Sequence, residues 1–212
     1  MDVKICGITN YLDARKAISQ GAQFLGLVLV EKINRSISDS DAFKLIEKLK
    51  KENVHIVGIF EEKNFEKIKQ RAKHLNLNYI QIVAPEKNED LNVLKDFKKF
   101  LVIPVNIDGS YNPVTYSLGK DDLWLYDTKT FGQGKTFNWD QFRRKEEGPF
   151  FIAGGLNSKN VATACMKLKP NGVDVSSGVC NHTNVEKDHI LIKQFIEKVS
   201  CYIDLQKSAN EI

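Results

Sequence analysis

The chain lacks long hydrophobic runs, and it has no charged amino-terminal segment followed by an apolar one. A membrane-spanning helix needs about 20 consecutive apolar residues, and a secretory signal needs a shorter apolar run behind positive charge. We therefore expect neither feature. These absences predict a cytoplasmic protein with no membrane partner.

Cysteine and histidine are also scarce, with four of each in 212 residues. Cys6, Cys165, Cys180 and Cys201 show no CxxC or Cys/His ligand spacing, which argues against structural zinc and against a disulfide framework. A chain of this length can bury about 70% of its unfolded surface and needs no such cross-link. We expect no metal.

A large excess of one charge is missing as well. The formal net charge is +4, and the lysines are scattered through helix-like segments. This distribution is typical of a solvated surface, so we expect no nucleic-acid partner. A mild positive balance would not hinder a small phosphorylated and carboxylated ligand.

Strand and helix patterns alternate along the chain. Expected strands cover residues 3–10, 23–30, 54–60, 79–83, 101–107, 122–126, 149–153 and 173–175. Expected helices cover 12–20, 38 or 40 to 51, 64–74, 90–99, 137–144, 157–168 and 186–203, whereas any helix within 108–120 is short or absent.

Strict alternation of strand and helix implies a parallel sheet with right-handed crossovers. Eight repeats in just over 200 residues favour a closed barrel over an open, doubly wound sheet. The expected fold class is therefore α/β, a single-domain (β/α)8 TIM barrel over residues 1–203. A loose polar tail is expected over 204–212.

Two polar, glycine-containing loops follow the last two strands. Gly154-Gly155 ends the seventh strand, and Ser176-Ser177-Gly178 ends the eighth. Glycines let backbone N–H groups approach a phosphate, and serines add hydroxyl donors. A lone Gly-Gly usually marks only a turn, but the loops after strands seven and eight are the usual phosphate cradle of such barrels. The pair predicts a phosphate-ester ligand.

Cys6 lies at the carboxyl end of the first strand, where ligands of parallel barrels sit. A strand cysteine is more often a small buried hydrophobe, but here Gly7 leaves room beside the thiol and Lys4 shares its face of the strand. A buried Lys4 needs a carboxylate partner, for which Asp174 is the candidate. A nearby ammonium would lower the pKa of the thiol, so Cys6 is a candidate catalytic group.

Asp127 and Arg35 are the next candidates. Asp127 ends the sixth strand. Such an aspartate often only caps a loop, but a carboxyl shielded from water can hold a proton near neutral pH and act as an acid. Arg35 follows the second strand and could bind a carboxylate or phosphate through two hydrogen bonds, or lie on the surface in water.

Five motifs join these residues into one pattern. They are KICGIT at 4–9, VGIF at 57–60, GKTFNW at 134–139, AGGLN at 153–157 and GVDVSSGV at 172–179. On these motifs almost the whole chain resembles the phosphoribosylanthranilate isomerase family, which has the (β/α)8 fold. The resemblance implies that Cys6 is the general base, that Asp127 in LYDTKT is the general acid, and that Arg35 holds the anthranilate end. Gly134 joins the expected substrate-binding residues.

The implied reaction is an Amadori rearrangement in tryptophan biosynthesis, an aldose–ketose isomerisation. It converts N-(5-phosphoribosyl)anthranilate to 1-(2-carboxyphenylamino)-1-deoxyribulose 5-phosphate. No cofactor is implied, because the nitrogen of the substrate itself forms the imine. The expected partner is therefore this small phosphorylated substrate, and a monomer is favoured over a homodimer.

Several loop positions depart from the family pattern. The departures are 81–84 (QIVA in place of Gln-Leu-His-Gly), Ile33-Asn34 in place of Ser-Pro, 131–134 (FGQG in place of Gly-Gly-Thr-Gly), and Cys180 in place of Glu. These changes bear on substrate affinity and rate, and they spare Cys6 and Asp127.

Two other functions compete with this interpretation. The related aminoaldose isomerase of histidine biosynthesis would carry a carboxylate at the position of Cys6. A non-catalytic sensor of phosphorylated ligands would fit the altered loops, but it would not need both Cys6 and Asp127. A purely structural protein would need neither group.

Overall fold

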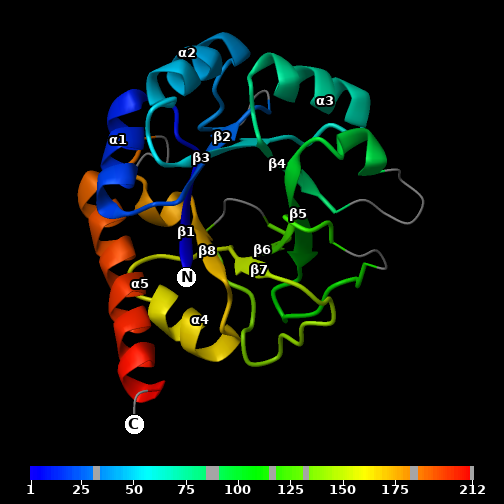
Figure 1. Ribbon diagram of the computed structural model, residues 1–212. Helices are drawn as coiled ribbons and strands as arrows, with labels where there is room; N and C mark the ends of the chain where they lie inside the picture. Colours follow the sequence, from blue (N-terminus) through cyan, green and yellow to red (C-terminus); the bar gives the residue numbers. More distant parts are fainter. Residues whose placement is uncertain (31–33, 85–90, 115–117, 131–133, 182–185, 211–212) are drawn as a thin grey trace.

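The computed structural model describes residues 1–30, 34–84, 91–114, 118–130, 134–181 and 186–210. Eight parallel strands follow one another around a closed barrel, from β1 to β8 and back to β1 (Figure 1). The strands are β1 (Asp2–Cys6), β2 (Phe24–Val28), β3 (His55–Ile59), β4 (Tyr79–Val83), β5 (Lys98–Val105), β6 (Leu123–Thr128), β7 (Phe150–Ile152) and β8 (Gly172–Val175). This topology confirms the expected (β/α)8 barrel.

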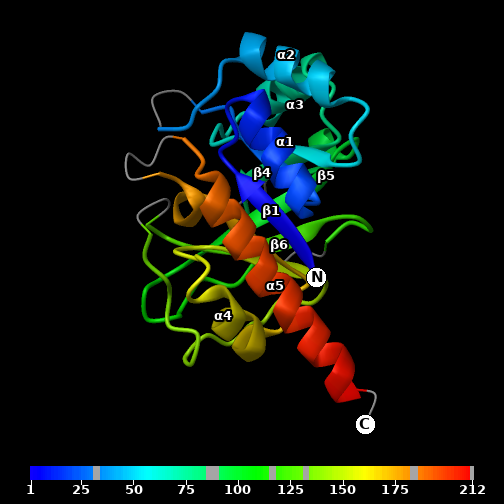
Figure 2. The ribbon, with the colours of Figure 1, turned by 90° about the vertical axis from the view of Figure 1, so that its left-hand side faces the viewer.

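Helices cover part of the outside of the barrel. They are α1 (Tyr11–Gln20), α2 (Asp39–Leu49), α3 (Phe65–His74), α4 (Val161–Leu168) and α5 (His189–Asn210), with short 3₁₀ turns η1 (Leu91–Leu94) and η2 (Ser177–Val179). The asparagine and serine caps of α1 to α3 explain their starts, since the side chains of Asn10, Ser38 and Asn64 each accept a backbone N–H from the first turn. α5 packs beside α1 and α4 and extends past the barrel (Figure 2).

The connections after β5 and β6 contain no α-helix within their described residues (Figure 1). A hydrogen-bonded cluster lies there instead. Glu146 accepts hydrogen bonds from the hydroxyls of Tyr111 and Tyr126, each 2.7 Å long, and from the backbone N–H of Val114. Since Phe142 packs against both tyrosine rings, this side of the barrel is covered by side chains rather than by a helix.

Three expected elements differ from the structure. The helix expected over 90–99 is only the turn η1, because β5 already begins at Lys98. The start of β5 is held by Asp122, whose carboxylate contacts the Lys99 ammonium at 3.1 Å and accepts the Lys99 backbone N–H at 2.9 Å. The helix expected over 137–144 is a single turn capped by the Asn138 side chain. The loose tail expected from 204 is wrong as far as Asn210, where α5 ends.

Side chains that point into the barrel form two layers. A lower layer is apolar and aromatic, and its residues are Phe24, Val57, Tyr79, Phe100, Leu125 and Phe151, while Val102 and Ala153 continue this cluster into the wall of the cavity above. Above it, toward the carboxyl ends of the strands, the inward positions carry Cys6, Gln81, Asp127 and Asp174. The fold therefore places the polar interior positions at the end where ligands of such barrels bind.

Candidate active site

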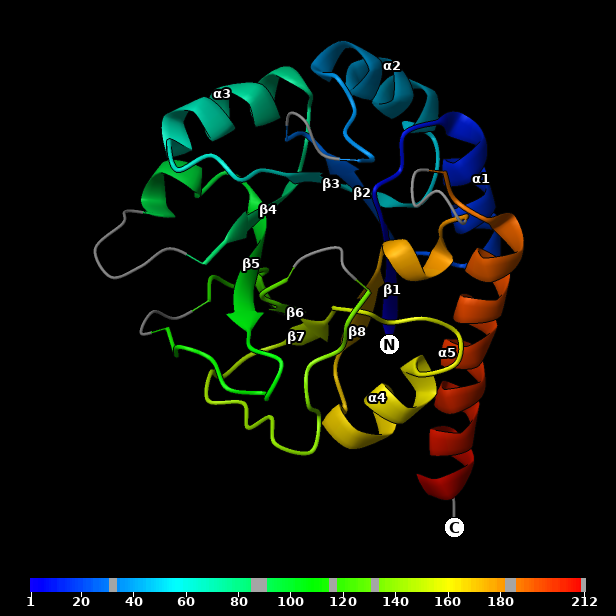
Figure 3. The same cartoon turned by 180° about the vertical axis from the view of Figure 1, so that it is seen from behind.

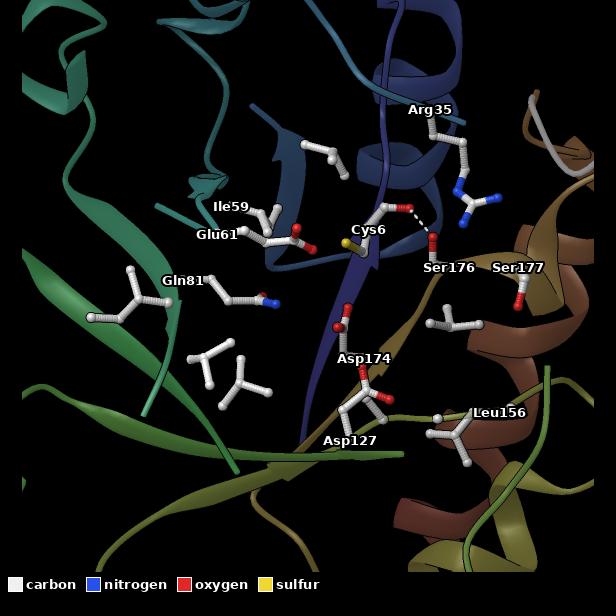
Figure 4. A pocket seen from close by; sticks show the side chains of 18 of the residues that line it. Cys6, Arg35, Ile59, Glu61, Gln81, Asp127, Leu156, Asp174, Ser176 and Ser177 are labelled. Carbon is white, nitrogen blue, oxygen red and sulfur yellow. Dashed lines mark hydrogen bonds between the residues drawn. The ribbon is translucent and has the colours of Figure 1, made fainter. Parts of the chain in front are cut away.

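A cavity of about 560 Å³ opens at the carboxyl ends of the strands (Figure 4). Its wall includes the predicted residues Cys6, Arg35, Asp127, Gly154, Gly155, Ser176 and Ser177. The side chains of Cys6, Asp127 and Asp174 converge on the same space in Figure 4. The structure thus brings seven of the nine predicted site residues into one pocket.

Cys6 is the last residue of β1, and its side chain is buried. The room for its thiol comes from Gly26 on the neighbouring strand, where a Cβ atom would lie 3.0 Å from the Cys6 Sγ atom. Gly7 serves a different neighbour, because a Cβ there would lie 3.1 Å from the Arg35 side chain. The expectation that Gly7 makes space for the thiol was therefore wrong, and Gly26 was missed.

Lys4 and Asp174 form the expected buried ion pair beneath the thiol. Their charged atoms are 3.0 Å apart, and β1 and β8 place the two residues side by side in register. Burial opposes the charge of Lys4, but attraction to Asp174 outweighs it and the lysine pKa is raised. For Cys6, burial raises the thiol pKa more than the Lys4 charge lowers it. The predicted direction of the Lys4 effect is present, but the net pKa of the thiol lies above its ordinary value.

Asp127 is held in an unusual protonation state by its surroundings. Burial, together with the negative charge of Asp174, raises the pKa of Asp127 to about 7. Gly154, in the loop after β7, packs closely over this carboxyl, since a Cβ at that position would lie 3.0 Å from an Asp127 oxygen. A group that is half protonated near neutral pH can donate a proton to a bound ligand.

Arg35 reaches the pocket from the loop after β2. Its backbone has a φ of 75°, in the left-handed region that residues other than glycine rarely adopt. Its side chain lies over Gly7 and borders the cavity next to Cys6. A guanidinium held in this way can bind an anionic group at the mouth of the pocket.

The two glycine- and serine-containing loops meet as predicted. Gly154 and Gly155, both with positive φ, line the same pocket as Ser176 and Ser177. The Ser176 hydroxyl donates to the Cys6 carbonyl at 3.1 Å, so the loop after β8 is tied to the strand that carries the thiol. Backbone N–H groups beside small side chains are the usual means of holding a phosphate.

Gly134 and Gly178 do not line the pocket. Gly134 is exposed, with nothing within 4 Å of a Cβ built on it. Gly178 has a packing role, because a Cβ there would lie only 1.9 Å from the Leu156 carbonyl oxygen of the neighbouring loop. Residues 131–133, part of an altered loop, lie outside the described residues, as does Ile33.

Sequence reasoning missed three polar residues of this region. Gln81 and Glu61 line the cavity from β4 and from the loop after β3 (Figure 4). Alternation along β4 could have found Gln81, because Tyr79 and Gln81 share a face. Lys187 is buried behind the loop after β8, and no local signal in the sequence marks it as buried.

Lys187 contacts Cys180, which stands where the family usually has a glutamate. Its ammonium donates to the Ser176 carbonyl oxygen at 3.0 Å and to the Cys180 sulfur at 3.3 Å. Burial lowers the pKa of Lys187, and within the described residues no carboxylate comes within 4 Å of its nitrogen. The turn η2, which joins Ser176 to Cys180, lies against α5 (Figure 3).

Comparison with known proteins agrees with this geometry. The sequence profile of N-(5'phosphoribosyl)anthranilate (PRA) isomerase matches residues 3–198. The chain belongs to this family. The isomerase of Streptococcus mutans is 38% identical over 93% of the chain and 97% of its own length.

The dimeric isomerase of Thermotoga maritima, solved as generated monomers, is 31% identical with a TM-score of 0.72, over 94% of this chain and 98% of that one. A second isomerase structure holds reduced 1-(o-carboxyphenylamino)-1-deoxyribulose 5-phosphate. Its sequence is 30% identical and its TM-score is 0.72, over 94% of this chain and 98% of that one.

Among the helices that the structure describes, none has the length and apolar character needed to cross a membrane.

Proposed function

We propose that this enzyme isomerises N-(5'-phosphoribosyl)anthranilate to 1-(2-carboxyphenylamino)-1-deoxyribulose 5-phosphate, the aldose–ketose step of its family in tryptophan biosynthesis. One observation carries the assignment of roles. A thiol and a carboxyl with a pKa of about 7 face the same pocket from β1 and β6. This pair is suited to moving protons on a sugar, with Cys6 as base and Asp127 as acid.

In the proposed mechanism, protonated Asp127 donates to the ring oxygen of the furanose. The bond between that oxygen and C1′ breaks, and the anilino nitrogen supplies the electron pair that forms the C1′–nitrogen double bond. The Cys6 thiolate then removes the proton from C2′, and the electrons of that bond neutralise the iminium to give an enolamine. Tautomerisation of the enolamine gives the ketone, and proton exchange with water restores both side chains.

The ends of the substrate match the two ends of the pocket. The phosphate would sit against Gly154, Gly155, Ser176 and Ser177, whose small side chains leave backbone donors accessible. The anthranilate carboxylate would pair with Arg35 beside Cys6. No cofactor enters the scheme, because the substrate provides its own imine nitrogen.

The test is an assay of the purified protein with N-(5'-phosphoribosyl)anthranilate, followed by loss of its fluorescence. Cys6→Ser and Asp127→Asn should each reduce kcat by about 10²–10⁴-fold, the usual contribution of a positioned acid or base. Cys201→Ser and Asp204→Asn make the same chemical changes on the exposed part of α5 and should keep full activity.

The outcomes separate the competing functions. Full activity in Cys6→Ser or Asp127→Asn would overturn the assigned roles. An inactive wild-type protein that still binds the substrate would favour a ligand sensor. Turnover of the aminoaldose of histidine biosynthesis at a comparable rate would show a broader isomerase.

We also propose that the enzyme works in the cytoplasm and as a monomer, with a homodimer as the competing state. A closed barrel that holds all the proposed reacting groups within one chain supports a monomer, whereas a relative from Thermotoga maritima is dimeric. Light scattering at micromolar concentration decides between masses of one and two chains. Fractionation of the source cells tests the location.

A further inference from the structure

Gln81 is a buried polar residue whose side-chain oxygen has no partner among the described residues. Its exposed fraction is 9%, and that oxygen is buried without a hydrogen bond to this part of the chain. The side chain projects from β4 into the cavity, toward Cys6 and Asp174 on the facing wall (Figure 4). A buried amide without a partner destabilises the folded protein, so its presence calls for a reason.

The neighbouring positions show that an apolar residue would fit there. In register with Gln81 are Ile59 on β3 and Phe100 on β5. Val102, the next inward position on β5, is also apolar and lines the same cavity. Because packing alone would favour an aliphatic side chain beside these apolar neighbours, the amide is better explained by a ligand.

The chemistry of an amide selects among the groups of the proposed substrate. Carboxylate and phosphate groups only accept hydrogen bonds, so they would leave the Gln81 oxygen without a donor. A hydroxyl both donates and accepts, and can therefore satisfy both ends of the amide. The charged ends of the substrate already have Arg35 and the serine- and glycine-containing loops as partners.

We propose that Gln81 binds a hydroxyl group of the sugar chain of the substrate, between its anthranilate and phosphate ends. This inference rests on the proposed isomerase function. The contact makes Gln81 a determinant of specificity, because a site built to bond a hydroxyl rejects an analogue that lacks it. It also fixes the sugar between the base on β1 and the acid on β6.

The test combines one substitution with removal of single hydroxyls from the ligand. Wild-type enzyme and Gln81→Leu are compared on N-(5'-phosphoribosyl)anthranilate and on its 3-deoxy analogue, by kcat/KM. The 2-deoxy analogue, which cannot form the ketone, is compared as an inhibitor. Gln70→Leu makes the same change on an exposed part of α3 and serves as the control.

Gln81→Leu should lower kcat/KM for the natural substrate by about 10²-fold, and wild-type enzyme should disfavour one of the deoxy ligands by a similar factor. Gln81→Leu should treat that deoxy ligand and its hydroxylated counterpart alike, within about threefold. Its midpoint of thermal unfolding should equal or exceed that of the wild type, because an unpaired buried amide is removed. If Gln81 had only a structural role, Gln81→Leu would instead lower the midpoint of thermal unfolding.

Unchanged kcat/KM in Gln81→Leu would overturn the inference while leaving the isomerase function intact. An unchanged preference for the hydroxylated ligands would do the same. If Gln81→Leu does not fold, Gln81→Met, which keeps the length of the side chain, is measured in its place. Absence of wild-type turnover would overturn the isomerase function, and this inference with it.

Discussion

The lower and upper halves of the barrel interior are built from the same strands but are organised in opposite ways. In the lower half, Phe24 contacts Tyr79, Phe100 and Phe151 edge to face, with ring centroids 5.2–5.7 Å apart. In the upper half, the Gln81 side-chain oxygen has no hydrogen-bond partner in the part of the chain that the structure describes, and the pKa of Asp127 is raised.

The two halves are separated by only two residues along a strand, about 7 Å. β4 carries Tyr79 below and Gln81 above, and β1 carries Lys4 below and Cys6 above. Stability and chemistry are therefore divided along the strand axis. Substitutions below should therefore cost stability, and substitutions above should cost activity and spare or increase stability.

The largest effect is expected from Phe100→Ala in the lower half. Phe100 is fully buried and contacts two other rings edge to face, so the cavity left by truncation should reduce the free energy of unfolding by about 3–5 kcal/mol. Urea unfolding measures the loss, and Phe43→Ala on the exposed face of α2 is the control. The folded variant should keep kcat within a few-fold, and a larger drop would show that the lower layer shapes the chemistry directly.

Lys4→Met tests the boundary between the halves. Removing the ammonium leaves Asp174 buried without its partner, which should reduce the free energy of unfolding by about 3 kcal/mol. The pKa of Cys6 should rise, because the positive charge that lowers it is lost. Urea unfolding and the pH dependence of thiol alkylation measure the two effects.

The double variant Lys4→Met with Asp174→Leu separates the effect on stability from the effect on the Cys6 pKa. The double variant should regain stability, because no unpaired charge remains in the barrel. The Lys44→Met variant on the surface of α2 is the matched control. A Cys6 pKa that stays at the wild-type value in Lys4→Met would remove lysine from the activation of the thiol.

Much of this architecture can be predicted from the sequence, because it depends on local patterns. Period-two alternation places Lys4 and Cys6 on one face of β1, and the cost of burying Lys4 requires an acid such as Asp174. The two glycine- and serine-containing loops could be placed together because the barrel has a fixed order of strands. Each of these inferences needs only spacing and charge.

The errors arise where a distant residue decides the local structure. Residues 90–99 have apolar spacing typical of a helix, but Lys99 pairs with Asp122, the residue just before β6, and β5 begins early. The segment 137–144 is fixed by contacts of Phe142 with Tyr111 and Tyr126. Likewise, the space for the Cys6 thiol comes from Gly26 across the β1–β2 pairing. Sequence spacing does not contain these contacts.

Asp127→Asn in the upper half should stabilise the protein at pH 8 by about 2 kcal/mol. The pKa of Asp127 is about 7 in the folded state and about 3.9 when unfolded, so ionisation favours the unfolded chain above pH 4. The full shift corresponds to about 4 kcal/mol, and solvent screening of this half-buried carboxylate reduces the effect to about 2 kcal/mol.

The gain in Asp127→Asn should grow between pH 4 and pH 7 and remain constant above it, as measured by urea unfolding at several pH values. Asp204→Asn on α5 is the control and should show no such trend. A loss of stability at pH 8 would mean that Asp127 is a stabilising residue of the barrel, contrary to the division proposed above.

The pH dependence of kcat/KM tests the protonation states of Asp127 and Cys6 in the upper half. The productive form needs Asp127 protonated and Cys6 ionised, although Asp127 has the lower pKa of the two. The fraction in this form rises about tenfold per pH unit up to about pH 7, where Asp127 begins to ionise, and then stays level until the Cys6 pKa is reached. In the residual activity of Asp127→Asn, the rise should continue past pH 7. A break that stays at pH 7 would belong to another group.

The smallest effect is expected from Lys187→Met, behind the upper half. The ammonium polarises the Ser176 carbonyl, and thereby the next peptide N–H, which belongs to the proposed phosphate loop. Loss of this charge should weaken inhibition by inorganic phosphate and raise KM about fivefold, close to 1 kcal/mol, with kcat nearly unchanged. Lys193→Met on the exposed face of α5 is the control. An unchanged inhibition constant would show that Lys187 supports packing alone, and that the loop binds phosphate without help from the buried charge behind it.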